Sequence, residues 1–287
     1  MRRPFRMKEL PQSFGPRTGL HGVLTLPGEA QAGAAPVGFL LFNAGVIPRC
    51  GPHRLNVKLA RTLAAAGHPV LRFDLSGHGD SPPAEATLDP QTQGRRDLAA
   101  AMDHLQATLG VQRFALVGIC SGAMNAYHAG LADPRVAGVL MFDGYWYRSR
   151  WTRWVRDAKR LRVLLRERGW RGAAERALRL VRQGSDGADS GIFSGSNNPP
   201  RAEFSRAVGE LSARAALYFV YSGSIIDCYS YAAQFRHVFG HEPWFRRVRC
   251  EFMADVDHSF LELRAQRRFI DAVIDWLPAV RHAAHAS

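Results

Sequence analysis

Cysteine is scarce in this sequence, and long hydrophobic runs are absent. The 287 residues include four cysteines, whose spacing matches neither a paired metal site nor a disulfide scaffold: Cys50, Cys120, Cys228 and Cys250. We therefore expect a reducing compartment, the cytoplasm, and no bound metal. The basic N-terminus has no apolar core behind it, and no run approaches the length of a membrane span. We accordingly expect neither a secretory signal nor a transmembrane segment.

Acidic residues are also few relative to basic ones. Lys and Arg number 38 against 25 Asp and Glu, which gives a formal net charge of +13 and a pI near 10.4. The excess is concentrated between Arg148 and Arg182, where 13 basic residues accompany three acids. Such a segment favours an anionic partner or forms a solvated helix face, and both interpretations stay open. Because neither a helix-turn-helix nor a zinc pattern is visible, we do not expect a nucleic-acid partner.

Short apolar runs alternate with helical patterns over the first half of the chain. The runs that indicate buried strands are Val37–Phe42, Pro69–Phe73, Phe114–Val117 and Val136–Phe142. The helical patterns between them are His53–Ala66, Thr92–Leu109 and Ser121–Leu131. This alternation predicts a parallel sheet flanked by helices, with a functional site at the carboxyl ends of its strands. Residues 1–36 are loose, and only Leu20–Leu26 alternates enough to form an edge strand.

The alternation is interrupted once, after the strand at Val136–Phe142. Tyr145–Gln183 has an Arg-rich helical pattern, residues 184–200 are typical of a loop, and Arg201–Ala213 is helical again. The core pattern then resumes with a strand, a helix, a strand and a final helix through Trp276: Ala216–Tyr221, Tyr229–Phe239, Val248–Phe252 and the C-terminal segment. We therefore expect a first core part at 1–144, a helical cap at 145–213 and a second core part at 214–287.

A strand, a tight turn and a helix meet at Cys120. Glycines stand two residues before and after it, at Gly118 and Gly122. This is the G-x-nucleophile-x-G pattern of a turn that lifts one side chain out on a strained backbone. Ser121 is the alternative nucleophile, but the residues two positions either side of it carry Cβ atoms, so we favour Cys120. The other interpretation of Cys120 is a buried cysteine that packs as a small hydrophobe.

His258 lies between the last apolar run and the final helix. An imidazole at that place is suited to deprotonate a thiol near neutral pH, although capping a helix is the other role open to it. Two carboxylates compete to orient this imidazole. Asp227 follows the first strand after the cap, and Asp143 ends the strand after Cys120. We place Asp227 first, with helix capping as its other role, and keep Asp143 as the alternative acid.

Across roughly residues 20–280 the chain resembles the α/β-hydrolase superfamily. The order nucleophile, acid, histidine matches that superfamily, and so does a cap placed after the strand that follows the elbow. D-L-S-G-H-G-D-S at 74–81 resembles its D-x-R-G-x-G-x-S turn, with Ser76 in place of Arg, and N-A-G at 43–45 stands where its members usually have H-G. The run from Phe42 to Ser81 and the Cys elbow resemble more narrowly the hydrolases encoded with exosortase systems.

The resemblance implies an α/β-hydrolase fold with an inserted helical cap and a Cys–His–Asp triad. It also implies an oxyanion hole, with one donor from the backbone N–H of Ser121 and another from Ala44 or Gly45. Dienelactone hydrolases and polyhydroxyalkanoate synthases are members of the superfamily with Cys at the elbow. Tyr145, Trp146 and Tyr147 enter the cap and line the acyl pocket or pack the cap on the core.

A cysteine nucleophile favours particular substrates. Its acyl-enzyme is a thioester, which forms from another thioester almost without free-energy change and from an oxyester or amide only uphill. We therefore expect a Cys-dependent acyl hydrolase or acyltransferase that needs no cofactor. Its small-molecule acyl substrate would be carried on coenzyme A or an acidic acyl carrier protein, because the Arg-rich segment suits phosphate or acidic groups. The alternatives are a non-catalytic scaffold or ligand-binding protein of the same fold and a binder of anionic polymers or membrane surfaces.

Overall fold

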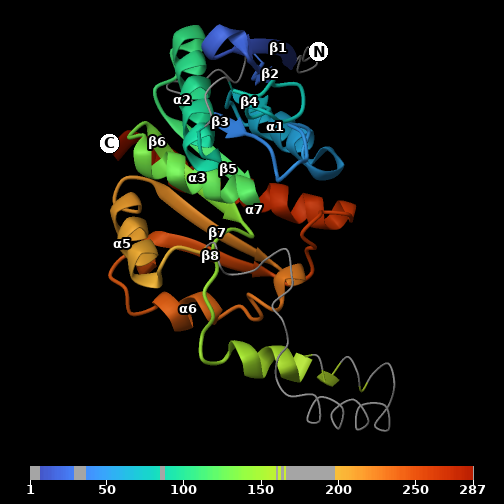
Figure 1. Ribbon diagram of the computed structural model, residues 1–287, viewed down its shortest axis with the longest axis vertical. Helices are drawn as coiled ribbons and strands as arrows, with labels where there is room; N and C mark the ends of the chain where they lie inside the picture. Colours follow the sequence, from blue (N-terminus) through green and yellow to red (C-terminus); the bar gives the residue numbers. More distant parts are fainter. Residues whose placement is uncertain are drawn as a thin grey trace, which may run out of the picture.

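An eight-stranded sheet runs through the centre of the molecule (Figure 1). The structure, a computed structural model, describes residues 7–28, 37–84, 88–159, 161–162, 165 and 198–286. The strand order is β1-β2-β4-β3-β5-β6-β7-β8. The strands are β1 (Lys8–Phe14), β2 (Leu20–Leu26), β3 (Gly38–Leu41), β4 (Val70–Phe73), β5 (Phe114–Ile119), β6 (Val136–Phe142), β7 (Ala216–Ser222) and β8 (Val248–Met253).

All strand pairs from β4 to β8 across the sheet are parallel, as predicted, while β1 and β2 pair antiparallel. Leu20–Leu26 was predicted as an edge strand, but it lies between β1 and β4. The true edge, Lys8–Phe14, was missed because it is mostly polar and contains Pro11. A proline is tolerated there because an edge strand has one side without ladder hydrogen bonds. The parallel strands direct the carboxyl ends of β3 to β8 to one edge, where the site lies.

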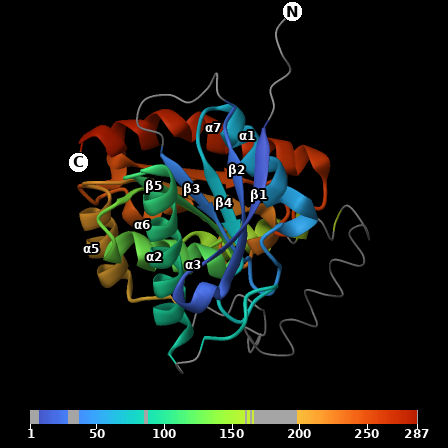
Figure 2. The ribbon, with the colours of Figure 1, turned by 90° about the horizontal axis from the view of Figure 1, so that it is seen from above.

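Helices cover both faces of the sheet (Figure 2). α1 and α7 pack on one face, and α2, α3, α5 and α6 on the other, because each has an apolar side that must be buried. Within the described residues no helix is long and apolar enough to cross a membrane. The helices are α1 (Leu55–Ala65), α2 (Pro90–Leu109), α3 (Ser121–Ala132), α5 (Arg201–Leu211), α6 (Gln234–Phe239) and α7 (Leu263–Ala286), with short 3₁₀ turns η1 (Pro16–Thr18), η3 (Pro52–Arg54), η5 (Gly223–Ile225) and η6 (Phe245–Arg247).

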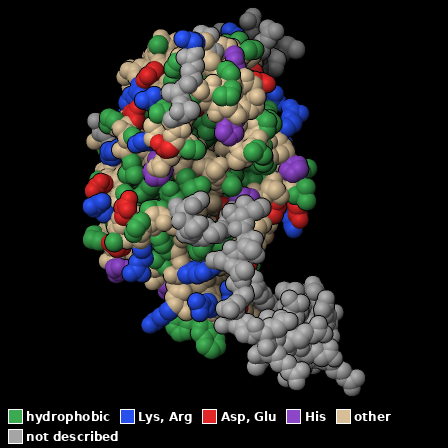
Figure 3. All heavy atoms as spheres, in the orientation of Figure 1, with side chains coloured by type: hydrophobic (Ala, Val, Ile, Leu, Met, Phe, Trp, Pro, Cys, Tyr) green, Lys and Arg blue, Asp and Glu red, His purple; other side chains and the backbone are tan. Residues whose placement is uncertain are grey.

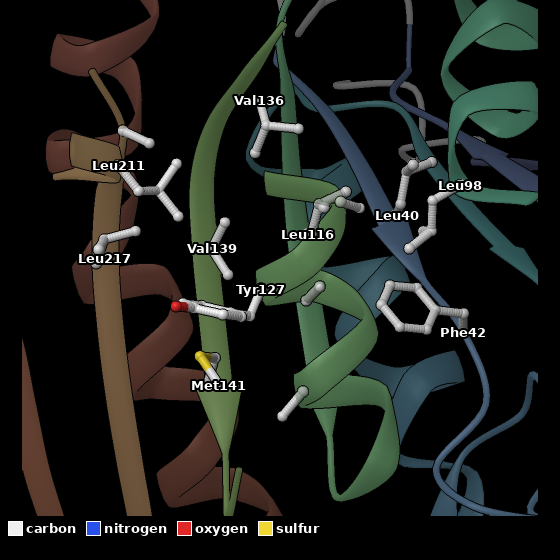
Figure 4. Close-up of a cluster of buried hydrophobic side chains, with 14 of the residues drawn as sticks. Leu40, Phe42, Leu98, Leu116, Tyr127, Val136, Val139, Met141, Leu211 and Leu217 are labelled. Atoms are coloured by element: carbon white, nitrogen blue, oxygen red, sulfur yellow. The ribbon is translucent and has the colours of Figure 1, made fainter. Parts of the chain in front are cut away.

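Successive residues of each central strand enter different cores. On β5, Phe114 and Leu116 belong to the cluster under α2, α3 and α5, whereas Ala115 and Val117 belong to the cluster under α1 and α7. Figure 4 shows the first cluster, in which Tyr127 of α3 lies over the strands. Strands buried on both faces read as continuous apolar runs rather than as alternating ones. This explains why the runs in the sequence predicted these strands well.

The segment predicted as a cap leaves the sheet after β6 and returns at β7. Residues 145–150 are not helical, contrary to the prediction, and a helix is present at 152–159. Residues 166–197 lie outside the described residues. The last predicted cap helix, α5, packs on the sheet instead, where Phe204, Val208 and Leu211 are buried among core residues of β5 to β7. The cap boundary at 213 was therefore placed too late, because α5 supplies the helix layer between β6 and β7.

Candidate active site

Cys120 stands at a strained turn between β5 and α3. Its backbone has φ 57° and ψ −125°, a positive φ that side chains other than glycine rarely adopt. Strain of this kind costs of order 1–3 kcal/mol, and it clusters at functional sites. A Cβ on Gly118 would lie 2.3 Å from the carbonyl oxygen of Gly122, and one on Gly122 would lie 2.6 Å from that of Asn43. The two glycines therefore make this turn possible, as the sequence pattern predicted.

Ser121 is the first residue of α3, and its hydroxyl is already engaged. Its Oγ accepts a hydrogen bond from the backbone N–H of Gly45 at 2.9 Å. Ser121 thereby ties the start of α3 to the loop that follows β3. It does not occupy the strained position of the turn, which favours Cys120 as the group that the turn presents.

His258 brings three groups together at the carboxyl edge of the sheet. Its Nδ1 lies 2.7 Å from Oδ2 of Asp143, and its backbone N–H donates to Oγ of Ser224 at 2.9 Å. Burial lowers the pKa of His258, but hydrogen bonds and charge interactions with Asp143 and Cys120 outweigh it and raise the pKa to about 9. Cys120 and His258 therefore interact through their side chains, as expected from the sequence. At this pKa the protonated imidazole is the favoured form near neutral pH.

Asp143 follows β6 in a left-handed backbone conformation, with φ 49°. Its side chain is fully buried and accepts three hydrogen bonds. The donors are the backbone N–H of Ser222 at 2.7 Å, Oγ of Ser222 at 2.6 Å and the imidazole of His258. A buried carboxylate is stable only with such partners, and bonds to an ionised acceptor are among the strongest in proteins. Asp143 is thereby fixed in both position and orientation.

The carboxylate paired with His258 is thus the one that the sequence ranked second. An imidazole has a single Nδ1, and Asp143 occupies it, so the prediction that Asp227 orients His258 is corrected. Asp227 lies half-buried in the loop after β7. The end of β7 and that loop contribute Ser222 and Ser224 instead, which hold the acid and the histidine. Both carboxylates lie near the carboxyl ends of neighbouring strands. Which of them contacts His258 depends on the three-dimensional direction of each side chain.

Sequence reasoning missed both of these serines. Their signal is the S-G-S at 222–224, where η5 begins and where Ser222 also caps the turn by accepting from the N–H of Ser224 at 3.3 Å. A Cβ on Gly223 would lie 2.2 Å from the carbonyl oxygen of Ala254. The glycine therefore lets this loop approach the loop that carries His258. Hydroxyls two residues apart at the end of a strand next to a candidate acid could have been recognised as its supports.

The loops after β3 and β4 are tied to each other beside the elbow. Asn43 donates from Nδ2 to Oδ1 of the buried Asp74 at 3.0 Å and accepts from the N–H of Leu75 at 2.7 Å. Ser76, which replaces an Arg of the resembled turn, hydrogen-bonds through N–H and Oγ to Asp97 of α2 at 2.7 and 2.9 Å. These bonds fix the loop at 43–45, which carries two of the predicted oxyanion donors.

Of those donors, Gly45 lies beside Ser121, since its backbone N–H donates to Oγ of Ser121. Gly45 has φ 58°, and a Cβ there would meet no atom within 4 Å, so the backbone is open on that side. Ala44 is buried and forms an isolated bridge with Ile47. A substrate oxygen that enters between the N–H groups of Gly45 and Ser121 would take the place of the Ser121 hydroxyl.

A cavity of about 830 Å³ opens beside the elbow, large enough for a small ligand. Gly45, Ser121, Met124, Asn125, His128 and Tyr145 are among the residues that line it. His128 forms a hydrogen bond through Nε2 with the hydroxyl of Tyr145 at 2.8 Å. Burial lowers the pKa of His128, which favours its neutral form.

Of the three aromatic residues predicted to line the pocket, Tyr145 does so. Trp146 and Tyr147 pack on the hydrophobic layer around Phe204, which is the packing role that the sequence left open.

Among the described residues, no group of three His, Cys, Asp or Glu side chains is arranged to hold a metal ion. The two acids that line the cavity, Asp89 and Asp97, cap α2 and hold Ser76. No Arg or Lys is among the described lining residues.

Comparisons with known proteins agree with this fold. A family model described as the alpha/beta hydrolase fold matches residues 46–179. A search of curated sequences gave no match. XC6422 from Xanthomonas campestris, an a/b serine hydrolase without lid, is 15% identical over 98% of this chain and 96% of its own, with a TM-score of 0.54.

Two esterases are equally similar in structure. The Pyrococcus furiosus esterase PF2001 is 15% identical over 96% of this chain and 91% of its own, with a TM-score of 0.55. Naproxen esterase from Bacillus subtilis is 14% identical over 96% and 92%, with a TM-score of 0.54.

The protein therefore has the α/β-hydrolase fold.

Proposed function

We propose that this protein is a Cys-dependent acyl hydrolase or acyltransferase that works through an acyl-enzyme intermediate. Cys120 is the nucleophile, His258 the general base and acid, and Asp143 the group that orients the imidazole. The observation that carries the proposal is the connected series of side chains Cys120, His258 and Asp143, with Cys120 raised on a strained turn. Strain is retained in a fold only where the surroundings impose it, and a functional turn is its usual reason.

The chemistry follows from that order of contacts. With Nδ1 bonded to Asp143, His258 holds the proton of the Cys120–His258 pair before the reaction, and Sγ of Cys120 attacks the substrate carbonyl carbon as the thiolate. A C–S bond forms, the oxygen becomes an oxyanion, and the leaving thiol or alcohol takes the proton from the imidazolium as its bond to carbon breaks. Water, or an alcohol or amine acceptor, then attacks the thioester with His258 as base, the C–S bond breaks, and Cys120 is released as the thiolate beside the protonated His258.

The oxyanion is the charge that develops during both steps. The backbone N–H groups of Gly45 and Ser121 are the donors that we assign to it, with Ala44 keeping their loop in place. Binding of the substrate oxygen exchanges the hydroxyl of Ser121 for the carbonyl as the acceptor of the Gly45 N–H. Once that exchange has taken place, donors held by the backbone need no further reorganisation during the reaction, which is the source of their effect on rate.

A thioester is the substrate class that we favour. Transfer between a substrate thiol and Cys120 is nearly balanced in free energy, whereas a serine nucleophile would make the same step downhill and the product harder to pass on. The cavity beside Ser121 and Tyr145 takes the neutral acyl group, since no basic side chain is among its described lining residues. A carrier with phosphate or acidic groups, such as coenzyme A or an acyl carrier protein, would lie outside it.

The experiment is a comparison of matched acyl thioesters and oxyesters in steady-state hydrolysis and in transfer to an added amine. We expect wild-type protein to prefer the thioester in kcat/KM and Cys120→Ala to lose activity on both. Cys250→Ala is the matched control, because burial raises the pKa of its thiol to about 12 and leaves it without a nucleophilic role. Equal activity of wild-type and Cys120→Ala would assign the catalysis to another group, and no activity in either would leave a non-catalytic scaffold as the better description.

A further inference from the structure

Three large apolar side chains stand exposed on or beside the helix at 152–159. Trp151 is 46% exposed, Trp154 74% and Leu161 48%. They recur at the three- and seven-residue spacing that places side chains on one side of a helix. Exposed tryptophans grouped on one helix face are unusual on a soluble surface and mark an interaction site.

The opposite side of this helix holds it to the rest of the molecule. Thr152 is buried, and its carbonyl accepts a hydrogen bond from Oγ of Ser230 at 3.3 Å. Lys159 donates to the carbonyl of Ser230 and lies 5.2 Å from the ring centre of Phe252. The helix is therefore anchored through Thr152 and Lys159, and Trp154 points away from the body. In Figure 1 the helix at 152–159 protrudes at the lower end of the molecule, beyond α6.

Basic side chains surround the exposed tryptophans. Arg148, Arg150, Arg153 and Arg162 are all exposed, and the guanidinium of Arg150 lies 5.1 Å from the ring centre of Trp151. Residues 148–162 contain seven Lys or Arg and one acid, Asp157. Figure 3 shows basic and hydrophobic side chains together at this end of the molecule. The surface therefore combines apolar groups with a strong positive charge.

We infer that this surface, Trp151, Trp154 and Leu161 with their flanking arginines, binds a lipid bilayer that contains anionic lipids. Tryptophan favours the boundary between headgroups and acyl chains, and basic side chains are attracted to anionic headgroups. A convex helix with apolar side chains on one face and basic ones beside them fits a deformable, planar lipid surface, in which it would lie flat. An acidic protein would need a groove that matches the two tryptophans, and is the competing outcome of the test.

The inference is independent of the chemistry at Cys120, and its test does not use activity as a readout. The protein is sedimented with vesicles of phosphatidylcholine alone and with vesicles in which a third of the lipid is phosphatidylglycerol. We expect binding to the anionic vesicles only, weakened by added salt because exposed charges are screened. Quenching of tryptophan emission by brominated lipids should accompany it.

Variants separate the apolar and electrostatic contributions. Trp151→Ser with Trp154→Ser should weaken vesicle binding by about tenfold or more and abolish the quenching difference. Arg150→Gln and Arg153→Gln should each weaken it by about fivefold. Leu263→Ser and Arg267→Gln replace an exposed leucine and an exposed arginine on α7, and as controls they should bind like wild-type.

Unchanged thermal unfolding of each variant shows that it is folded. Equal binding to neutral vesicles, or equal binding by the tryptophan variants and the controls, would overturn the inference. So would absence of vesicle binding together with tight, Trp154-dependent binding to an acidic protein such as an acyl carrier protein.

Discussion

Cys120 differs from serine in both the acidity of its side chain and the stability of its ester. A serine hydroxyl is a much weaker acid than a thiol, so a serine at this position would depend more on His258 to remove its proton. The resulting oxyester lies downhill from a thioester and passes its acyl group on slowly. Sulfur in place of oxygen in the nucleophile therefore matters most for transfer of the acyl group to an acceptor.

Replacement of Cys120 by Ser tests this difference. We predict that Cys120→Ser is acylated more slowly than wild-type and then holds the acyl group longer, with transfer to an amine reduced more than hydrolysis. Stopped-flow acylation and single-turnover deacylation measure the two steps separately. Wild-type turnover in both steps would show that the sulfur has no special role.

The assignment of the acid gives a second prediction at this scale. Asp143→Asn keeps the size of the side chain but removes the charge that stabilises the imidazolium, so kcat/KM should fall by about 10²–10³-fold. Asp227→Asn, the matched control in the neighbouring loop, should change it by less than about threefold, since Asp143 occupies Nδ1 of His258. The reverse ranking in steady-state kinetics would return the role to Asp227.

Some of the site residues could be predicted from the sequence, and others could not. Cys120 could be predicted because its signal is local: two glycines at fixed spacing. His258 was found from its place between a strand and a helix. The choice between Asp143 and Asp227 depends on contacts between loops 79 or more residues apart, such as the bonds from Ser222 to Asp143. Those contacts leave no local pattern.

At the scale of elements, the turn between β5 and α3 should be the least tolerant of added volume. A Cβ on Gly118 would lie 2.3 Å from one backbone atom and 2.6 Å from another, so either the strand or the helix must shift. We predict that Gly118→Ala lowers the free energy of unfolding by about 3 kcal/mol.

The control is Gly110→Ala at the end of α2. Gly110 has φ 69°, but a Cβ there meets no atom within 4 Å. Gly110→Ala should lower the free energy of unfolding by only about 1–2 kcal/mol, which is the cost of the left-handed conformation for a residue with a Cβ. Urea unfolding of both variants measures the difference, and equal losses would mean that the turn relaxes around the added methyl group.

Most strands could be predicted because burial on both faces produces short, continuous apolar runs. β6 was predicted with its observed bounds, Val136–Phe142. The helix predicted at Tyr229–Phe239 begins only at Gln234, because backbone groups before it are used in loop contacts. The N–H of Ser230 donates to Oε1 of Gln234 at 2.9 Å, and the carbonyl of Cys228 accepts from Nε2 of Gln234 at 2.8 Å. β1 was not predicted because a polar edge strand has no apolar run in the sequence.

At the scale of the whole molecule, the interaction of His258 links stability to pH. The pKa of about 9 in the folded state exceeds the ordinary 6.5, so the folded state binds the proton more tightly. This stabilisation is fully present below pH 6.5 and is lost as the pH rises through 9, by at most on the order of 3 kcal/mol.

We predict that wild-type protein loses stability between these two pH values and that His258→Gln loses much less. Urea unfolding across the range measures both, with Asp227→Asn as a control that should behave like wild-type. Parallel curves for wild-type and His258→Gln would contradict the interaction with Asp143 and Cys120.

The central claim is that Cys120 forms a covalent acyl-enzyme, and intact-mass spectrometry after rapid mixing with an activated acyl thioester tests it most directly. Peptide mapping locates the acyl group, and neutral hydroxylamine releases it if the bond is a thioester. We predict one acyl group on Cys120 in wild-type protein and in Ser121→Ala, and none in Cys120→Ala. An acyl group on Ser121 in Cys120→Ala, or wild-type turnover without any acylated protein, would contradict the account.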